Sequence, residues 1–121
     1  MTKVRKHYWT SGLVTDDSMA DQIIQQYEKM STSSDKPIFL HAVTMQNHTN
    51  YNRDNYPDDE RVHVVSHPVG LKSSTVGALE DFATGIRDAD AMLGKLTAYF
   101  SQVDEPVILV FWGDHYNPID S

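Results

Sequence analysis

The sequence contains no cysteine, few basic residues and no long apolar run. The lack of cysteine excludes disulfide scaffolds, thiolate zinc sites and cysteine nucleophiles. Lysine and arginine together number 10 against 17 aspartates and glutamates, and the net charge of -7 argues against a general nucleic-acid-binding protein. The longest apolar run, residues 106–112, is far shorter than the roughly 20 residues that a membrane-spanning helix needs. The 121 residues therefore predict one domain at most, without a membrane span of its own.

Two segments have the periodicity of amphipathic helices. Residues 16–31 place apolar side chains three or four positions apart, with Thr15 or Asp16 as the expected N-cap. Residues 74–101 carry a longer stripe at the same spacing: Leu79, Phe82, Ile86, Ala89, Leu93, Leu96 and Phe100. Ser73 or Ser74 is the expected N-cap of this second helix. The pattern places Glu80 and Asp81 on its solvent side.

Two short apolar segments, residues 37–45 and 106–112, are typical of strands that are buried on both faces. A long helix between two such strands implies that they run parallel in an α/β arrangement of layers. Two strands make too small a sheet to be stable alone, so the chain is interpreted as part of a larger sheet. Residues 61–65 are a further candidate for a brief edge strand, and residues 46–60 read as a long loop.

Polar side chains follow both predicted strands. The first strand leads into Gln46, Asn47 and His48, and the second leads through Gly113 into Asp114 and His115. Because ligands bind beyond the carboxyl ends of parallel strands, these residues are candidates for one shared site. A carboxylate and an imidazole suit Mn²⁺ or Zn²⁺, although catalytic metal sites generally need about three protein ligands. The other histidines, His41, His63 and His67, are more simply packing or surface residues.

The order of these motifs resembles the sulfatase-like branch of the alkaline phosphatase superfamily, and within it the lipoteichoic-acid-synthase-like phosphoglycerol transferases of bacteria. The resemblance covers nearly the whole chain and rests on four segments: Trp9–Asp17, Pro37–Thr49, Leu79–Phe100 and Val107–Tyr116. It implies that residues 1–121 are a carboxyl-half part of a catalytic domain with a three-layer αβα fold and a mostly parallel sheet. The nucleophile, a Thr in that family, and a Glu metal ligand would come from an amino-terminal part that has no match here.

The resemblance also implies roles for individual residues. Asp114 and His115 would bind a divalent metal, with Mn²⁺ expected first and Mg²⁺, Ca²⁺ or Zn²⁺ as alternatives. His48, Asn47 and Trp9 would contact the substrate, which is expected to be a phosphoglycerol lipid or another phosphate or sulfate ester. The intact protein would be membrane-anchored and act at the extracellular face of the bacterial membrane. The fragment alone is expected to be soluble, inactive and able to self-associate through an exposed sheet edge.

Two other functions are compatible with the same residues. One is a non-catalytic α/β interaction module that retains the sheet without a complete active site. The other is a small self-contained metallohydrolase that combines Asp114 with several of the histidines, although their spacing matches no established zinc pattern. A nucleophile-bearing segment upstream in the natural gene would favour the enzyme.

Overall fold

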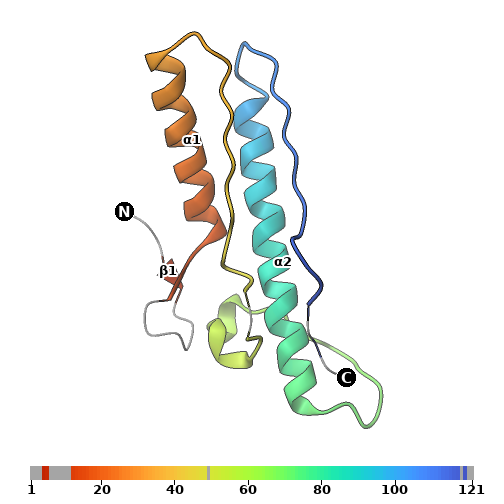
Figure 1. The fold of residues 1–121 in the computed structure, drawn as a ribbon. Helices are drawn as coiled ribbons and strands as arrows, with labels where there is room; N and C mark the ends of the chain where they lie inside the picture. The colour runs from red at the N-terminus through yellow and green to blue at the C-terminus, as the bar shows by residue number, and fades with distance from the viewer. Residues whose placement is uncertain (1–3, 6–11, 49, 118, 120–121) are drawn as a thin grey trace.

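The computed structural model describes residues 4–5, 12–48, 50–117 and 119, and its main feature is a pair of long helices packed side by side (Figure 1). The helices are α1 (Asp16–Ser33) and α2 (Ser73–Phe100), and the smaller elements are β1 (Val4–Arg5), β2 (Leu13–Val14) and two 3₁₀ turns, η1 (Arg53–Asn55) and η2 (Asp58–Glu60). Strands β1 and β2 pair antiparallel, with Val4 opposite Val14.

Both helices lie where the sequence predicts them, within two residues at each end. Thr15 caps α1 as expected, because its Oγ1 accepts a hydrogen bond from the backbone N–H of Ser18 at 3.2 Å. The predicted cap of α2 is wrong. Ser73 is already the first helical residue, and Lys72, which precedes it, has no side-chain hydrogen bond to the helix.

The two helices enclose a small apolar core. Ala20 of α1 is fully buried against Met92 and Leu96 of α2, and four partly buried side chains surround them: Met19, Ile23, Ile24 and Phe100. Tyr27 packs edge-on against Phe100 with 5.1 Å between the ring centroids. This contact lies at the end of the helix pair that is far from the polar loops (Figure 1). Together these apolar contacts fix the orientation of the two helices relative to each other.

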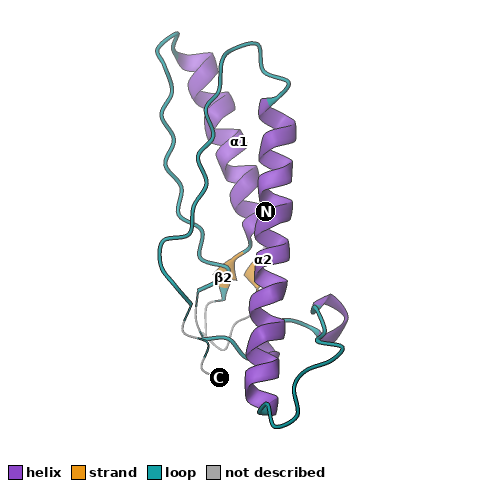
Figure 2. Ribbon diagram, turned by 90° about the vertical axis from the view of Figure 1, so that its right-hand side faces the viewer, coloured by secondary structure: helices purple, strands orange, loops and turns teal. Residues whose placement is uncertain are grey.

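Residues 37–45 and 106–112 run in the same direction along one side of the helix pair, as expected, but they form no sheet with each other (Figures 1 and 2). No backbone hydrogen bond joins these two segments. Strand pairing needs a neighbouring chain within about 4.8 Å, and the only strands in the described part are β1 and β2. The predicted parallel sheet therefore stays unconfirmed.

The extended segments expose apolar side chains that a buried strand would hide. Phe39 is 85% exposed and Ile108 is 91% exposed, and the neighbouring Val43, Val110, Phe111 and Trp112 are exposed as well. One contact crosses between the segments, where the ring of His41 stacks on Trp112 with 6.3 Å between the centroids. His41 therefore contacts Trp112 but is exposed rather than part of a core.

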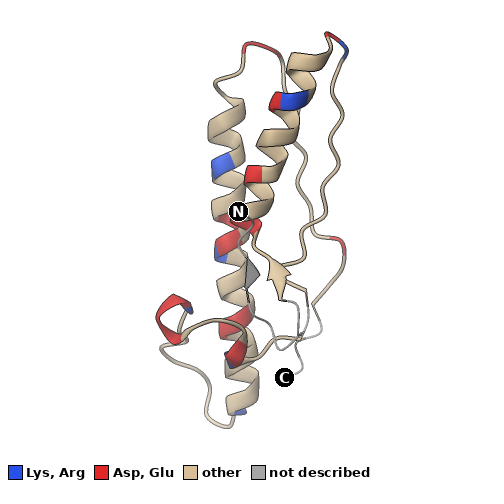
Figure 3. Ribbon diagram, turned by 90° about the vertical axis from the view of Figure 1, so that its left-hand side faces the viewer, with Lys and Arg blue, Asp and Glu red and all other residues tan. Residues whose placement is uncertain are grey.

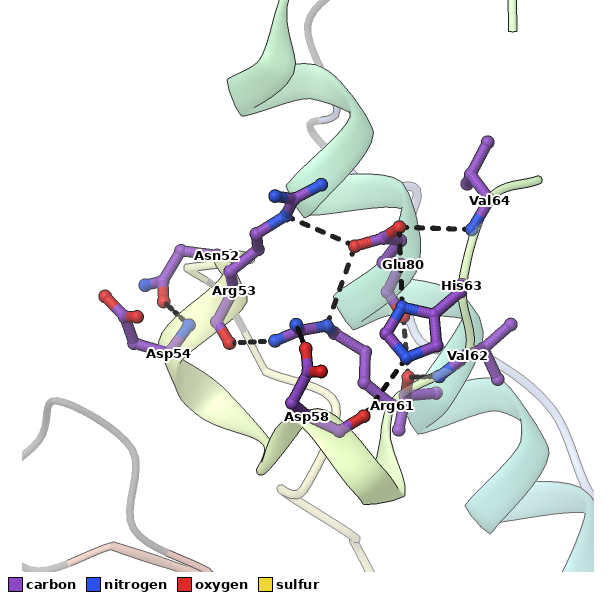
Figure 4. A network of polar contacts seen from close by, with 10 residues as sticks. Asn52, Arg53, Asp54, Asp58, Arg61, Val62, His63, Val64 and Glu80 are labelled. Carbon is purple, nitrogen blue, oxygen red and sulfur yellow. Dashed lines mark hydrogen bonds and ion pairs between the residues drawn. The ribbon is translucent and has the colours of Figure 1, made fainter. Parts of the chain in front are cut away.

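Residues 61–64 do not form the predicted edge strand, because side chains of α2 take the place of a neighbouring strand. Thr84 Oγ1 accepts from the backbone N–H of Val62 at 2.9 Å, and Glu80 Oε1 accepts from the backbone N–H of Val64 at 3.1 Å. The loop therefore lies along α2 and is held there by side chains (Figure 4).

The same loop buries two acidic residues that the helical pattern assigns to solvent. Glu80 is 3% exposed and Asp81 is 2% exposed. Glu80 Oε2 forms ion pairs with Arg53 Nε at 3.3 Å and Arg61 Nε at 3.6 Å, and His63 lies nearby (Figure 4). The two arginines offset the cost of burying the carboxylate. Elsewhere acidic positions occur along both helices, and the Lys and Arg positions of the described part are scattered along the chain (Figure 3).

Replacing Glu80 by Ala is expected to lower the free energy of unfolding by about 3 kcal/mol, because Arg61 and the Val64 amide would lose their buried partner. Urea unfolding followed by circular dichroism measures the change. The matched control is Asp90→Ala on the exposed side of the same helix, with an expected change below about 0.5 kcal/mol. Equal effects of the two substitutions would contradict the role given to Glu80.

Candidate functional site

The first candidate segment is the turn that follows the extended residues 37–45. The backbone N–H of His48 donates to the carbonyl of Met45 at 3.1 Å, which closes the turn. Asn47 is half-buried and His48 is exposed, so the histidine ring is accessible from solvent. A backbone hydrogen bond therefore holds the turn, and the His48 side chain points to solvent from it.

Gln46, directly before this pair, is 1% exposed and anchors the turn to three other segments. Its Oε1 accepts from the backbone N–H of Asp16 at 2.7 Å, at the start of α1. Its Nε2 donates to Asp88 Oδ2 of α2 at 2.6 Å and to Tyr56 Oη at 3.2 Å. Buried amides that make this many hydrogen bonds are costly to disturb, so Gln46 determines where the turn lies.

The second candidate segment follows the extended residues 106–112. Asp114 and His115 lie next to each other, with 3.7 Å between Asp114 Oδ1 and His115 Nε2. Their side chains are 79% and 60% exposed. His115 Nδ1 lies 2.9 Å from the carbonyl oxygen of Tyr116, so the ring nitrogen that faces Asp114 is Nε2.

Tyr51 brings the two candidate segments to the same end of the structure. Its hydroxyl lies 3.0 Å from the carbonyl oxygen of Asn47 and 2.5 Å from Oδ1 of Asn117, two residues after His115. Its ring packs on Phe82 of α2. Burial, and next the charges of Asp81 and Asp114, raise the pKa of Tyr51, so the phenol stays protonated and can donate. Tyr51 therefore links the two segments, although no sheet edge forms between them.

Asp114 and His115 offer a carboxylate oxygen and an imidazole nitrogen, which can both bind a divalent metal. Two ligands are fewer than the three that a catalytic metal site generally has. Among the residues that the structure describes, no group of three or more His, Cys, Asp or Glu side chains is placed to hold a metal ion. His63 contacts Glu80 at 3.9 Å and His67 is exposed, so neither joins Asp114. The described residues thus supply at most part of a metal site. Trp9, the third expected substrate contact, lies outside the described residues.

Two aspartates, Asp16 and Asp81, are buried although the sequence pattern does not predict it. Asp16, expected only to cap or to begin α1, is 1% exposed. Burial, and next the nearby charge of Asp88, raise the pKa of Asp16 to about 6. Burial likewise raises the pKa of Asp81 to about 6, although Asn55 donates to it at 2.8 Å.

Comparison of the sequence with known protein families identifies the family of this chain. A model of the sulfatase family matches residues 1–121. The chain belongs to the sulfatase family. Members of this family are generally metal-dependent and have an alkaline-phosphatase-like α/β fold.

One relative of this sulfatase-family chain is a protein of Rhizobium meliloti (strain 1021) that is provisionally named for cyclic beta-1,2-glucan modification. The two are 27% identical over 107 residues. The alignment covers 88% of this chain and 16% of the relative, so the chain spans about a sixth of that protein's length. No solved structure matches the chain. Within the described part, neither helix is long and apolar enough to cross a bilayer.

Replacing Asp16 by Asn is expected to stabilise the sulfatase-family chain at neutral pH. Because its pKa is raised from 3.8 to about 6 in the folded state, the stability linked to Asp16 is fully present below pH 3.8 and is lost as the pH rises through 6. The difference between the variant and the unmodified chain should grow across this window to roughly 3 kcal/mol at most.

Urea unfolding at a series of pH values measures this difference. Asp90→Asn, on the exposed side of α2, is the control and should give a constant difference. A constant difference for Asp16→Asn as well would show that its pKa is ordinary.

Proposed function

We propose that the protein is a metal-dependent phosphoglycerol transferase or sulfatase-like hydrolase that acts on phosphate or sulfate esters of the bacterial cell envelope. One observation supports the proposal: in a sulfatase-family chain, the Tyr51 hydroxyl contacts both the Asn47 carbonyl and Asn117, two residues after His115, at one end of two extended segments that run in parallel. Ligand sites of α/β proteins lie at such ends.

In this proposal Asp114 and His115 are two ligands of a divalent metal, with Mn²⁺ first and Mg²⁺, Ca²⁺ or Zn²⁺ as alternatives. The bound metal would offset negative charge on the ester oxygens and lower the pKa of an attacking hydroxyl. His48, exposed at the turn, would hold the phosphate or sulfate group or protonate the leaving oxygen. Asn47 would donate from its amide, and Trp9 would contact the rest of the substrate.

The remaining parts of the site would come from elsewhere in a longer protein, as a Thr nucleophile and a further carboxylate ligand. The low coverage of the relative, 16% of its length, supports a longer protein. The relative's name makes a cyclic beta-1,2-glucan the first acceptor to test. We place the intact enzyme at the extracellular face of the membrane, anchored there by another part of its chain.

The second candidate is a non-catalytic interaction module. No group of three possible metal ligands lies together in the described part, and Asp114 and His115 are mostly exposed, which favours this candidate. The two functions differ in what the natural gene encodes, because only the enzyme needs a nucleophile-bearing segment.

The enzyme proposal predicts that Asp114→Asn and His115→Ala each abolish metal-dependent turnover by the natural protein that contains these residues. Hydrolysis of bis(4-nitrophenyl) phosphate and 4-nitrophenyl sulfate, with Mn²⁺ added, measures activity, and calorimetry measures Mn²⁺ affinity. Loss of one ligand should weaken metal binding and lower kcat by roughly 100-fold or more. Asp104→Asn, an exposed carboxylate before the second extended segment, is the control. Unchanged Mn²⁺ affinity in both ligand variants would refute the assignment.

We also propose that other strands of the longer protein cover the exposed residues 37–45 and 106–112. Their apolar side chains and unpaired backbone support this, since such edges seek a neighbouring strand. In that protein the amides of Leu40 and Leu109 should exchange hydrogen at least about 1000-fold more slowly than in the 121-residue chain. The amide of Val65, in an exposed loop, is the control within the same molecule.

Sedimentation of the 121-residue chain separates the possible partners. Self-association that protects the same amides would identify a second copy as the partner instead. Rapid exchange of Leu40 and Leu109 in the longer protein would contradict any covering strand.

A further inference from the structure

Helix α2 contacts the Asn47–His48 turn at two positions one turn apart. At the first, Asp88 accepts from Gln46 Nε2 at 2.6 Å, and Arg87 holds the other Asp88 oxygen at 2.9 Å. At the second, Gly85 is buried beneath the side chain of Asn47. Residues three apart on a helix share one face, so both contacts come from the same side of α2.

The contact at Gly85 leaves no room for a side chain at this position. A Cβ atom at this position would lie 2.6 Å from Asn47 Cγ and closer still to Asn47 Oδ1. Real side chains do not approach so closely, so the Asn47 amide occupies space that only glycine leaves open. Nothing comparable surrounds Gly94, nine residues further along the helix, where a Cβ would meet no atom within 4 Å. The absence of a side chain at position 85 therefore sets the position of the Asn47 side chain.

We propose that Gly85 and Asp88 are positioning residues for substrate binding: Gly85 seats the Asn47 amide, and Asp88, through Gln46, holds the turn that presents Asn47 and His48. The inference rests on the proposed function for its link to substrate. Neither α2 residue touches the substrate, and both act by fixing where the two substrate-binding side chains stand.

The test is Gly85→Ala in the natural protein that contains residues 1–121, assayed with bis(4-nitrophenyl) phosphate and Mn²⁺. The added methyl group displaces the Asn47 amide, so KM should rise about 10-fold, the loss expected for one hydrogen bond to a charged group. The kcat should change less than about 2-fold, because the metal ligands lie on the other segment. Gly94→Ala makes the same chemical change on the same helix and should leave both constants within about 2-fold.

A double-mutant cycle separates positioning from general damage to the fold. In an Asn47→Ala background, Gly85→Ala should change KM by less than about 2-fold, because the displaced side chain is already gone. A full 10-fold effect in that background would overturn the proposal. The helix content should persist in Gly85→Ala, since Ala favours helix over Gly.

A crystal structure of the Gly85→Ala protein tests the geometry without reference to activity. The expected result is an Asn47 side chain turned away from α2, with Gln46 still bonded to Asp88. An unmoved Asn47 would overturn the inference. If the unmodified protein turns over none of the esters while Asn47 does move in the variant, the proposed function fails. The inference that Gly85 sets the position of the Asn47 side chain would then still hold.

Discussion

The carboxamide of Gln46 makes hydrogen bonds to three segments that lie far apart in the sequence, and the arrangement of the polar end depends on it. It accepts from the first turn of α1, donates to Asp88 in the middle of α2, and donates to Tyr56 in the loop. A carboxamide can do this because it carries both an acceptor and donors, whereas a carboxylate in its place would face Asp16 and Asp88 with like charge. The apolar core between the helices sets their angle, but Gln46 sets where the turn lies on them.

Glu80 serves the neighbouring loop in a similar way. Residues 61–64 are extended but have no strand beside them, so the amides of Val62 and Val64 would be unsatisfied against the helix without side-chain acceptors. Thr84 and Glu80 supply these acceptors, and Arg53 and Arg61 balance the charge of the buried Glu80. In both places a long polar side chain bonds groups that secondary structure would otherwise satisfy. Such anchoring is specific, because one lost partner leaves several buried groups unpaired.

These anchors also mark the limit of what the sequence predicts. Both helices follow from local periodicity, and Thr15 follows from local capping chemistry, so each was predicted almost to the residue. The burial of Glu80 and Asp81 depends on a loop some twenty residues earlier, which no helical pattern reports. The rule for parallel strands predicts that the segments of Asn47 and Asp114 end close together, whereas Tyr51, which bridges them, is identified only by the structure. The predicted strands at residues 37–45 and 106–112 need neighbouring strands to pair with, and the described part of the chain supplies none beside them.

If the proposed function holds, one missing neighbour explains both the exposed apolar segments and the exposure of Asp114 and His115. Asp114 and His115 stand at the end of residues 106–112, whose edge is unpaired. Two mostly solvated ligands bind a divalent ion weakly, because water competes for it and screens the charge. A strand that paired with this edge would bury the apolar side chains, exclude water from the same end and bring its own terminal residues to it. Completing the sheet and completing the metal site are then one event, so metal affinity should follow the pairing of the edge rather than the identity of the two ligands alone.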